Sequence, residues 1–306
     1  MTQRDARSRH TGIAMLVAGA LLLAACTPRV GVAPAAAAPD AVARDASRPS
    51  PACSASATGP LPERLLVDGR RRSLQIAAPT APSRAPRDLV IAFHGRTNDA
   101  ARARGYFRLD EALPDAIIVY PQALPAGPGA FAWGDPGDPP DALRDFGLVE
   151  TIIEAVGEAR CIDLQRVFVV GHSLGAYFAN DVACALGDRV RAVASVAGGL
   201  QGGGCAAGTA ALLLHHPDDP LVPLSAGERA RDAFRAANGL AWAPAMPAMD
   251  PALTPLRCVR YGADGVPDPV VWCAHDDATW PGGRVDPHTW PDGAPAAIAA
   301  FFRQLP

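Results

Sequence analysis

A serine between two glycines, in the pattern Gly171-x-Ser173-x-Gly175, follows the apolar run 167–170 and precedes a sequence that favours a helix. This pattern is typical of a nucleophile elbow, a sharp turn that holds a nucleophilic serine between a strand and a helix. The serine backbone is strained there, and side chains two residues away on either side would collide as strand turns into helix. The stretch therefore predicts Ser173 as the nucleophile of an acyl-transfer reaction.

A serine hydroxyl needs a base within hydrogen-bond reach and an acid that orients this base. After a nucleophile elbow, the acid and then the base follow along the chain. Asp218 and Asp219 both come just after a buried strand. We favour Asp219 as the acid, because the stretch 219–223 places it where the loop turns back, and Asp218 is the alternative. We favour His288 as the base, directly before the last predicted helix, and His275 is the alternative.

Three further histidines lie close to these candidates in the sequence. His172 belongs to the elbow itself, and we expect it to pack beside Ser173, because its side chain points away from that of the serine. His215 and His216 precede the candidate acids, and either could hold a loop through hydrogen bonds. None of the three is predicted to be the base.

Acyl transfer also needs backbone N–H groups that face the negative charge developing on the carbonyl oxygen. The residue after the nucleophile, Leu174, is expected to supply one of these groups. The other is expected from the turn that follows the apolar run 89–93, at Arg96 or Thr97. The sequence leaves the choice between these two residues open.

The segments that must position these residues alternate between strand and helix from residue 89 onward. Short apolar runs indicate strands buried on both faces, and apolar residues recurring on one face indicate helices. A hairpin is predicted at 65–76, strands at 89–93, 117–120, 167–170, 190–197, 210–214 and 270–272, and helices at 99–113, 141–160, 225–238 and 294–303. This alternation predicts an α/β fold with a mostly parallel sheet, in which sites form at the carboxyl ends of the strands.

Aromatic residues could shape the substrate pocket of such a site. The segment 121–140 is rich in Pro and Gly, carries Phe131 and Trp133, and is expected to be a long ordered loop or a lid. Trp133 and Trp290 are the candidates to line a pocket for an aromatic acid, together with Phe131. Partial burial under loops is the alternative for each of them.

The N-terminal segment 1–26 has the features of an export signal. Basic residues are followed by an apolar stretch at 13–25, and the sequence Leu-Ala-Ala-Cys at 23–26 resembles a bacterial lipobox. We expect Cys26 to carry a lipid that attaches the protein to a membrane, with an ordinary cleaved signal as the alternative. Residues 27–60, rich in Ala, Pro and Ser, are then a flexible tether, and 61–306 form the catalytic domain.

The cysteines and the charged residues exclude several kinds of site and partner. Seven cysteines include Cys26, and the remaining even number suits disulfides in an exported protein. Cys258 and Cys273 flank a turn-rich segment and are predicted to pair, and no Cys or His spacing fits a zinc site. All 28 basic residues are arginine, which excludes Schiff-base and P-loop lysines. The formal charge of −3, without a basic face, argues against a nucleic-acid partner.

A series of motifs, taken in order, resembles the exported esterases that group polyhydroxybutyrate depolymerases with feruloyl and acetyl-xylan esterases. The matching stretches are 94–98, 119–122, 161–163 with 166–168, 196–199, 219–223, 270–273 and 288–291. The resemblance covers about residues 60 to 306 and implies an α/β-hydrolase fold with a triad of Ser173, Asp219 and His288.

The resemblance also implies an ester substrate, either a phenolic ester of a polysaccharide or a polyester oligomer, and a reaction that needs no metal or organic cofactor. One departure concerns the base. The family commonly has glycines just before this histidine, soon after the last strand, whereas here the stretch 279–283 lacks a histidine and His288 follows later. An insertion explains the difference. The rival hypothesis is a cell-surface binding lipoprotein on a hydrolase scaffold that has lost its activity.

Overall fold

The computed structural model of the chain describes residues 47–55, 59–81, 83, 85–134, 144–202, 204–205, 208–279 and 285–306. The export signal predicted at 1–26 lies outside these residues, as does the predicted tether as far as residue 46. Within the described ranges, no helix has both the length and the apolar character that a membrane crossing requires. Residues 43–306 form one unit by their contacts.

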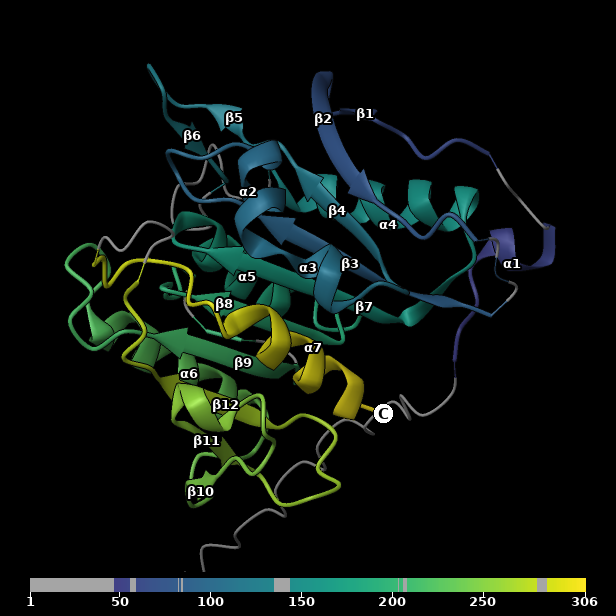
Figure 1. Cartoon of the computed structure of the whole chain (residues 1–306). Helices are drawn as coiled ribbons and strands as arrows, with labels where there is room; N and C mark the ends of the chain where they lie inside the picture. Colours follow the sequence, from purple (N-terminus) through teal and green to yellow (C-terminus); the bar gives the residue numbers. More distant parts are fainter. Residues whose placement is uncertain are drawn as a thin grey trace, which may run out of the picture. The chain divides into compact units, whose positions relative to one another are not determined.

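The described residues contain a central sheet of ten strands. Their spatial order is β1-β2-β4-β3-β7-β8-β9-β12-β11-β10 (Figure 1). The strands are β1 (Arg64–Val67), β2 (Arg70–Ala77), β3 (Arg87–Phe93), β4 (Ile117–Pro121), β7 (Ile162–His172), β8 (Ala192–Val196), β9 (Ala210–His215), β10 (Met246–Pro247), β11 (Cys258–Tyr261) and β12 (Val270–Ala274). The strands from β4 to β12 are parallel, and antiparallel pairs flank them at both edges. The carboxyl ends of the parallel strands therefore meet at one edge, where a site can form.

Helices cover both faces of this sheet, as the continuous apolar strands require. The helices are α2 (Ala100–Phe107), α3 (Leu109–Ala112), α4 (Phe146–Ala159), α5 (Leu174–Ala185), α6 (Leu224–Ala237) and α7 (Ala294–Gln304). One core cluster joins the sheet to α2, α3 and α7, and the other joins it to α4, α5 and α6 (Figure 1). Alternate residues of the central parallel strands belong to the two clusters, such as Val90 and Ile91 of β3. The predicted mostly parallel α/β architecture is confirmed.

Two elements of the structure differ from the prediction. The helix predicted at 99–113 is divided into α2 and α3 at Arg108, whose φ of 49° lies in the left-handed region and ends α2. The short strand β11 was not predicted, because its four residues do not form an apolar run. It is fixed instead by antiparallel pairing with β12, in which Cys258 lies opposite Cys273.

The described residues contain three disulfides, Cys53–Cys161, Cys184–Cys205 and Cys258–Cys273. The last is the pair that flanks the turn between β11 and β12. A small hairpin of β5 (Leu124–Pro125) and β6 (Phe131–Ala132) lies in the long segment after β4. Disulfides are typical of oxidising compartments, so these bonds fit an exported protein.

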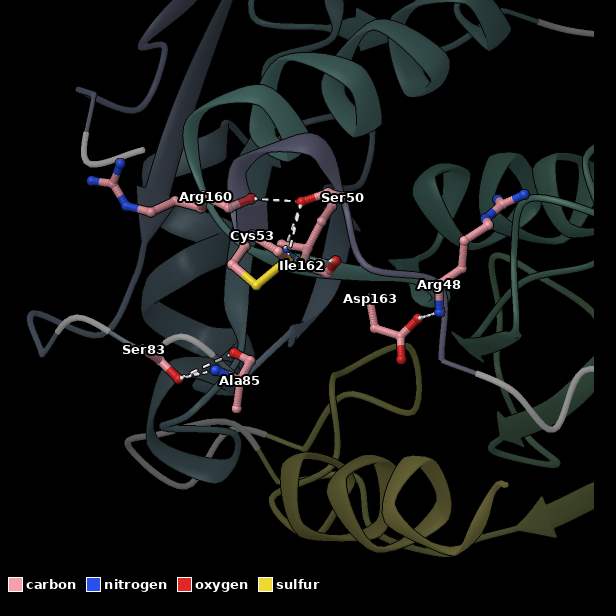
Figure 2. Close-up of a disulfide and its surroundings, with 9 residues drawn as sticks. Arg48, Ser50, Cys53, Ser83, Ala85, Arg160, Ile162 and Asp163 are labelled. Carbon is pink, nitrogen blue, oxygen red and sulfur yellow. Dashed lines mark hydrogen bonds between the residues drawn. A yellow bond between two sulfur atoms is a disulfide. The ribbon is translucent and has the colours of Figure 1, made fainter. Parts of the chain in front are cut away.

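The segment 48–55, which the sequence assigns to the tether before residue 60, is bound to the domain. Arg48 and Ser50 pair with the start of β7: the Ser50 N–H donates to the Ile162 carbonyl at 2.9 Å, and the Arg48 N–H donates to the Asp163 carboxylate at 2.9 Å. The short helix α1 (Pro51–Ala55) follows, and its Cys53 forms the disulfide with Cys161 (Figure 2). The Ala- and Ser-rich composition of the segment 48–55 gave no sign of these contacts, because they depend on partners more than 100 residues away in the sequence.

Candidate active site

Ser173 occupies the sharp turn between β7 and α5, with φ 57° and ψ −124°, a backbone conformation that is strained for any residue except glycine. A Cβ atom on Gly171 would lie 2.1 Å from the Gly175 carbonyl oxygen, and one on Gly175 would lie 2.1 Å from the Phe93 carbonyl oxygen. Only glycine fits at these two positions. The Ser173 N–H donates to the Val196 carbonyl of β8 at 3.0 Å, which ties the turn to the neighbouring strand.

The side chains of Ser173, His288 and Asp219 form a continuous chain of hydrogen bonds. His288 Nε2 lies 2.8 Å from Ser173 Oγ, and His288 Nδ1 lies 2.7 Å from Asp219 Oδ2. An ionised carboxylate can only accept hydrogen bonds, so Nδ1 carries the proton and Nε2 presents its lone pair to the serine hydroxyl. This arrangement can remove the serine proton when the hydroxyl attacks a carbonyl.

Asp219 lies in the turn after β9 and is 7 % exposed. Its Oδ1 atom accepts the N–H groups of Leu221 at 2.8 Å and Val222 at 2.9 Å. Burial by itself raises the pKa of this carboxyl, but the hydrogen bonds from His288, Val222 and Leu221 outweigh burial and hold the pKa below its usual value. The carboxylate is therefore ionised at neutral pH and fixed in orientation.

The two alternatives from the sequence lie away from this chain of hydrogen bonds. Asp218 is exposed, and its backbone N–H donates to His216 Nδ1 at 3.0 Å. His275 is buried, its Nδ1 lies 3.1 Å from the Asp277 carbonyl, and its ring packs against that of His216 with centroids 5.7 Å apart. The structure brings His288 and Asp219 to Ser173, and it brings neither Asp218 nor His275.

Two of the remaining histidines support the loops that carry these residues. His215 Nε2 lies 2.9 Å from the Val222 carbonyl, across the turn that contains Asp219. His172 Nε2 lies 2.9 Å from the backbone carbonyl of His288. The burial of both rings lowers their pKa values, so both are neutral at neutral pH.

The backbone groups expected to bind an oxyanion lie next to Ser173. Leu174 is the first residue of α5, and the first N–H groups of a helix have no acceptor within the helix. The turn after β3 passes against the nucleophile, since a Cβ atom on Gly95 would lie 3.2 Å from Ser173 Cβ. Arg96 and Thr97 follow in this turn, and both remain candidates for the second donor.

The buried side chain of His94 holds this turn in place. Its Nε2 accepts the Ala123 N–H at 3.1 Å, so its Nδ1 carries the proton and donates to the Gly95 carbonyl at 2.8 Å. The Trp133 indole N–H donates to the His94 carbonyl at 2.9 Å. These contacts were not predicted, because they depend on the approach of the segment after β4 to the end of β3.

Trp133 and Trp290, the candidates to line a substrate pocket, are both buried. Trp133 is 4 % exposed, and its ring stacks on Phe178 with centroids 5.3 Å apart. Trp290 is 5 % exposed and stacks on Phe107 at 4.1 Å. Trp290 belongs to one of the two core clusters and Trp133 to the other. Phe131 of β6 is partly exposed and packs edge-on against His94.

The chain is similar in sequence to known esterases and in fold to a solved carboxylesterase. Feruloyl esterase C of Emericella nidulans is 28 % identical over 244 residues, which cover 76 % of this chain and 80 % of the relative. Poly(3-hydroxyalkanoate) depolymerase C of Paucimonas lemoignei is 30 % identical over 163 residues, 52 % of this chain and 38 % of the relative. The Bacillus cereus carboxylesterase structure superposes with a TM-score of 0.53 at 13 % identity, over 76 % of this chain and 94 % of that one. The fold is that of an α/β-hydrolase.

These relatives confirm the resemblance to feruloyl esterases and polyhydroxyalkanoate depolymerases that the motif series predicted. Feruloyl esterase C also confirms the prediction of a carboxylic ester hydrolase. No family model matches the chain. Among the described residues, no group of three or more His, Cys, Asp and Glu side chains could hold a metal ion.

Proposed function

We propose that the chain is an exported serine esterase in which Ser173, His288 and Asp219 act as a catalytic triad. The observation that carries the proposal is the unbroken set of hydrogen bonds from Ser173 Oγ through His288 to Asp219, at 2.8 and 2.7 Å. The strained backbone of Ser173 supports the same conclusion, because strain at one residue persists where function requires it.

In the proposed reaction, Ser173 Oγ attacks the ester carbonyl while His288 Nε2 takes its proton. Asp219 keeps the proton of His288 on Nδ1 and stabilises the imidazolium that forms. The N–H of Leu174, with that of Arg96 or Thr97, binds the oxyanion of the tetrahedral intermediate, and His288 returns the proton to the leaving alcohol. Water then attacks the acyl-enzyme by the same route, with His288 as base, and releases the acid. The proposed mechanism needs no cofactor.

For the substrate, we propose a phenolic ester of the feruloyl type, attached to a polysaccharide. The support is the length of the match, since the chain aligns with 80 % of feruloyl esterase C but with 38 % of the depolymerase. The second candidate is a hydroxyalkanoate polyester oligomer, which the match to the depolymerase favours. Both reactions use the same triad chemistry and differ in the acid that Ser173 carries.

We propose further that the protein is attached to a membrane of the cell envelope by a lipid on Cys26. The support comes from the lipobox-like sequence at 23–26, outside the described residues, and from disulfides that fit an exported protein. Replacement Cys26→Ser tests the anchor, since it should move the protein from the membrane fraction to the soluble fraction. Retention of the variant in the membrane fraction would reject lipidation.

The activity is tested on residues 27–306 with three substrates: methyl ferulate, a short-chain 4-nitrophenyl ester and a hydroxybutyrate oligomer. We expect hydrolysis of at least one, fastest for methyl ferulate, and no hydrolysis by Ser173→Ala. Equal rates for wild type and Ser173→Ala on all three would overturn the proposed triad. Faster hydrolysis of the hydroxybutyrate oligomer would instead favour the second candidate substrate, a hydroxyalkanoate polyester.

A further inference from the structure

A second histidine, His172, touches the backbone of the proposed catalytic base. His172 is the last residue of β7, is 5 % exposed, and approaches the His288 carbonyl oxygen with its Nε2 atom at 2.9 Å. The two imidazole rings lie side by side with centroids 5.3 Å apart. His172 is therefore placed to act on the position of His288 and not on Ser173.

The protons in this contact are determined by the partners of His172. A carbonyl oxygen can only accept, so Nε2 of His172 must carry the proton and donate to His288. A neutral imidazole then has a lone pair on Nδ1, and this atom lies 3.1 Å from the hydroxyl of Tyr106. Burial and the nearby His288 lower the pKa of His172 to about 4, and burial raises the pKa of Tyr106, so both groups are neutral. The Tyr106 hydroxyl therefore donates to His172.

Tyr106 brings the opposite side of the site into the same set of contacts. It lies in the last turn of α2, and its hydroxyl oxygen accepts hydrogen bonds from the Gly95 backbone N–H and the Asn98 side chain, in the turn that carries Arg96 and Thr97. The chain of contacts thus runs from the turn with the proposed oxyanion donor, through Tyr106 and His172, to the backbone of His288.

His288 needs such support because it lies in a turn and not in a strand or helix. Its N–H donates to the Asp286 carboxylate at 3.1 Å, within the same turn. Of the contacts that the described residues make with the His288 backbone, the one from His172 comes from the central sheet. The sheet also carries Ser173 directly after His172, so one strand end sets the positions of both nucleophile and base.

We propose that His172 and Tyr106 are positioning residues that act as one unit: His172 holds the His288 backbone at the height where Nε2 reaches Ser173 Oγ, and Tyr106 fixes the tautomer of His172 that can do so. The inference rests on the proposed triad. Without the Tyr106 hydroxyl, the His172 proton can move to Nδ1, and the Nε2 lone pair would then face the His288 carbonyl oxygen and repel it. Both residues act through His288 and touch no reacting atom.

The test uses residues 27–306 and a short-chain 4-nitrophenyl ester, with kcat and KM measured separately. Loss of positioning lowers kcat and leaves KM unchanged, because the substrate still binds while the base is displaced. A misplacement of about 1 Å can cost about a hundredfold, so we expect kcat to fall about a hundredfold in His172→Leu and about tenfold in Tyr106→Phe. His172→Gln keeps a donor and an acceptor, and it should recover at least half of the logarithmic loss.

Folding and coupling separate positioning from a merely structural role. The matched control is Tyr120→Phe, which should leave kcat unchanged. It removes the hydroxyl of another tyrosine, and this hydroxyl donates to the Asp110 carboxylate at 3.4 Å and not to a residue of the triad. Tyr106→Phe removes a single hydroxyl and should melt within a few degrees of wild type. The double variant Tyr106→Phe/His172→Leu should be no slower than His172→Leu, since residues that act as one unit are not additive.

Three results would overturn the inference: a kcat of Tyr106→Phe within twofold of wild type, multiplicative losses in the double variant, or a change confined to KM. Ser173→Ala, assayed beside these variants, distinguishes the two proposals. If Ser173→Ala is inactive while Tyr106→Phe and His172→Leu retain wild-type kcat, the positioning role fails and the triad stands. If Ser173→Ala retains activity, the proposed function itself fails.

Discussion

Asp219 accepts a hydrogen bond from the Nδ1–H group of His288 at 2.7 Å, although the two residues are 69 positions apart in the sequence. The carboxylate is held by the backbone of its own turn, and the histidine is held by a turn before α7, so each comes from a separate part of the chain. Their meeting depends on β9 and β12 being parallel neighbours, because the segments that leave these two strands then emerge at the same edge of the sheet.

Replacement Asp219→Asn should reduce kcat by about 10⁴ while the protein remains folded, because an amide that donates to Nδ1 stabilises the wrong tautomer of His288. The matched control is Asp218→Asn, which changes the adjacent and exposed carboxyl and should leave kcat within twofold. Steady-state kinetics on a soluble ester measure both. If Asp218→Asn were the slower variant, the acid would be assigned to the wrong residue.

His288→Ala should lose at least about 10³ in kcat, since the proton of Ser173 then has no acceptor within reach. His275→Ala should retain activity, because its ring lies against His216 and its Nδ1 faces the Asp277 carbonyl. The rate of covalent labelling of Ser173 by a fluorophosphonate provides a second measurement that does not depend on the substrate chosen. Full activity of His288→Ala would reject it as the base.

The sequence predicted the parallel sheet because its strands are apolar on both faces, and such runs are visible without any partner. The sequence left Asp218 as an alternative to Asp219 for the catalytic acid, because both residues come shortly after β9. The structure distinguishes them through the Leu221 and Val222 N–H groups, which hold only Asp219 toward His288. A turn geometry of this kind depends on backbone angles that the residue types do not specify.

Other contacts of the site were not predictable, because they arise from packing between distant segments. Tyr106 has no motif around it, and its position over His172 follows from how α2 packs on the sheet. The burial of Trp133 and Trp290 was not predictable for the related reason that an aromatic side chain in a loop can turn toward either solvent or core. Here the stacked rings of Phe178 and Phe107 favour the core.

Gly171→Ala should abolish activity and destabilise the fold, because its Cβ would lie 2.1 Å from the Gly175 carbonyl oxygen. Overlap with backbone cannot be relieved by rotation of a side chain, so the elbow itself must move. The control is Gly105→Ala in α2, where nothing lies within 4 Å of the added Cβ and about 0.5–1 kcal/mol of stabilisation is expected. Thermal melting and kcat report the two effects, and an active Gly171→Ala would contradict the elbow geometry.

Removal of the Cys53–Cys161 disulfide by Cys53→Ala/Cys161→Ala should destabilise the protein more than removal of Cys258–Cys273. The first bond spans 108 residues and the second 15. In the chain-entropy model, loops of about 100 and about 15 residues correspond to about 4.7 and about 3 kcal/mol. Urea unfolding measures the difference. Limited proteolysis should also cut near residues 47–55 earlier in the first variant, and an unchanged cleavage pattern would show that hydrogen bonds alone hold this segment.

The unfolding free energy should fall as the pH is lowered from about 6.5 to about 4, because several histidines are buried, and His172 and His275 are the two with the largest pKa shifts. Burial lowers the pKa of each from 6.5 to about 4, with His288 and His216, respectively, acting in the same direction. In this window the unfolded chain binds protons that the folded chain does not, so stability is fully present above pH 6.5 and is lost toward pH 4.

Each histidine accounts for about 3 kcal/mol of this loss at most, from about 1.36 kcal/mol per pKa unit. His275→Leu should flatten the dependence by about that amount, whatever its effect on stability at pH 7, because only the difference between pH 7 and pH 4.5 is compared. Asp219 does not interfere, since its lowered pKa moves its own loss of stability below this window. Urea unfolding at the two pH values measures the slope, and an unchanged slope in His275→Leu would mean that His275 is protonated in the folded protein.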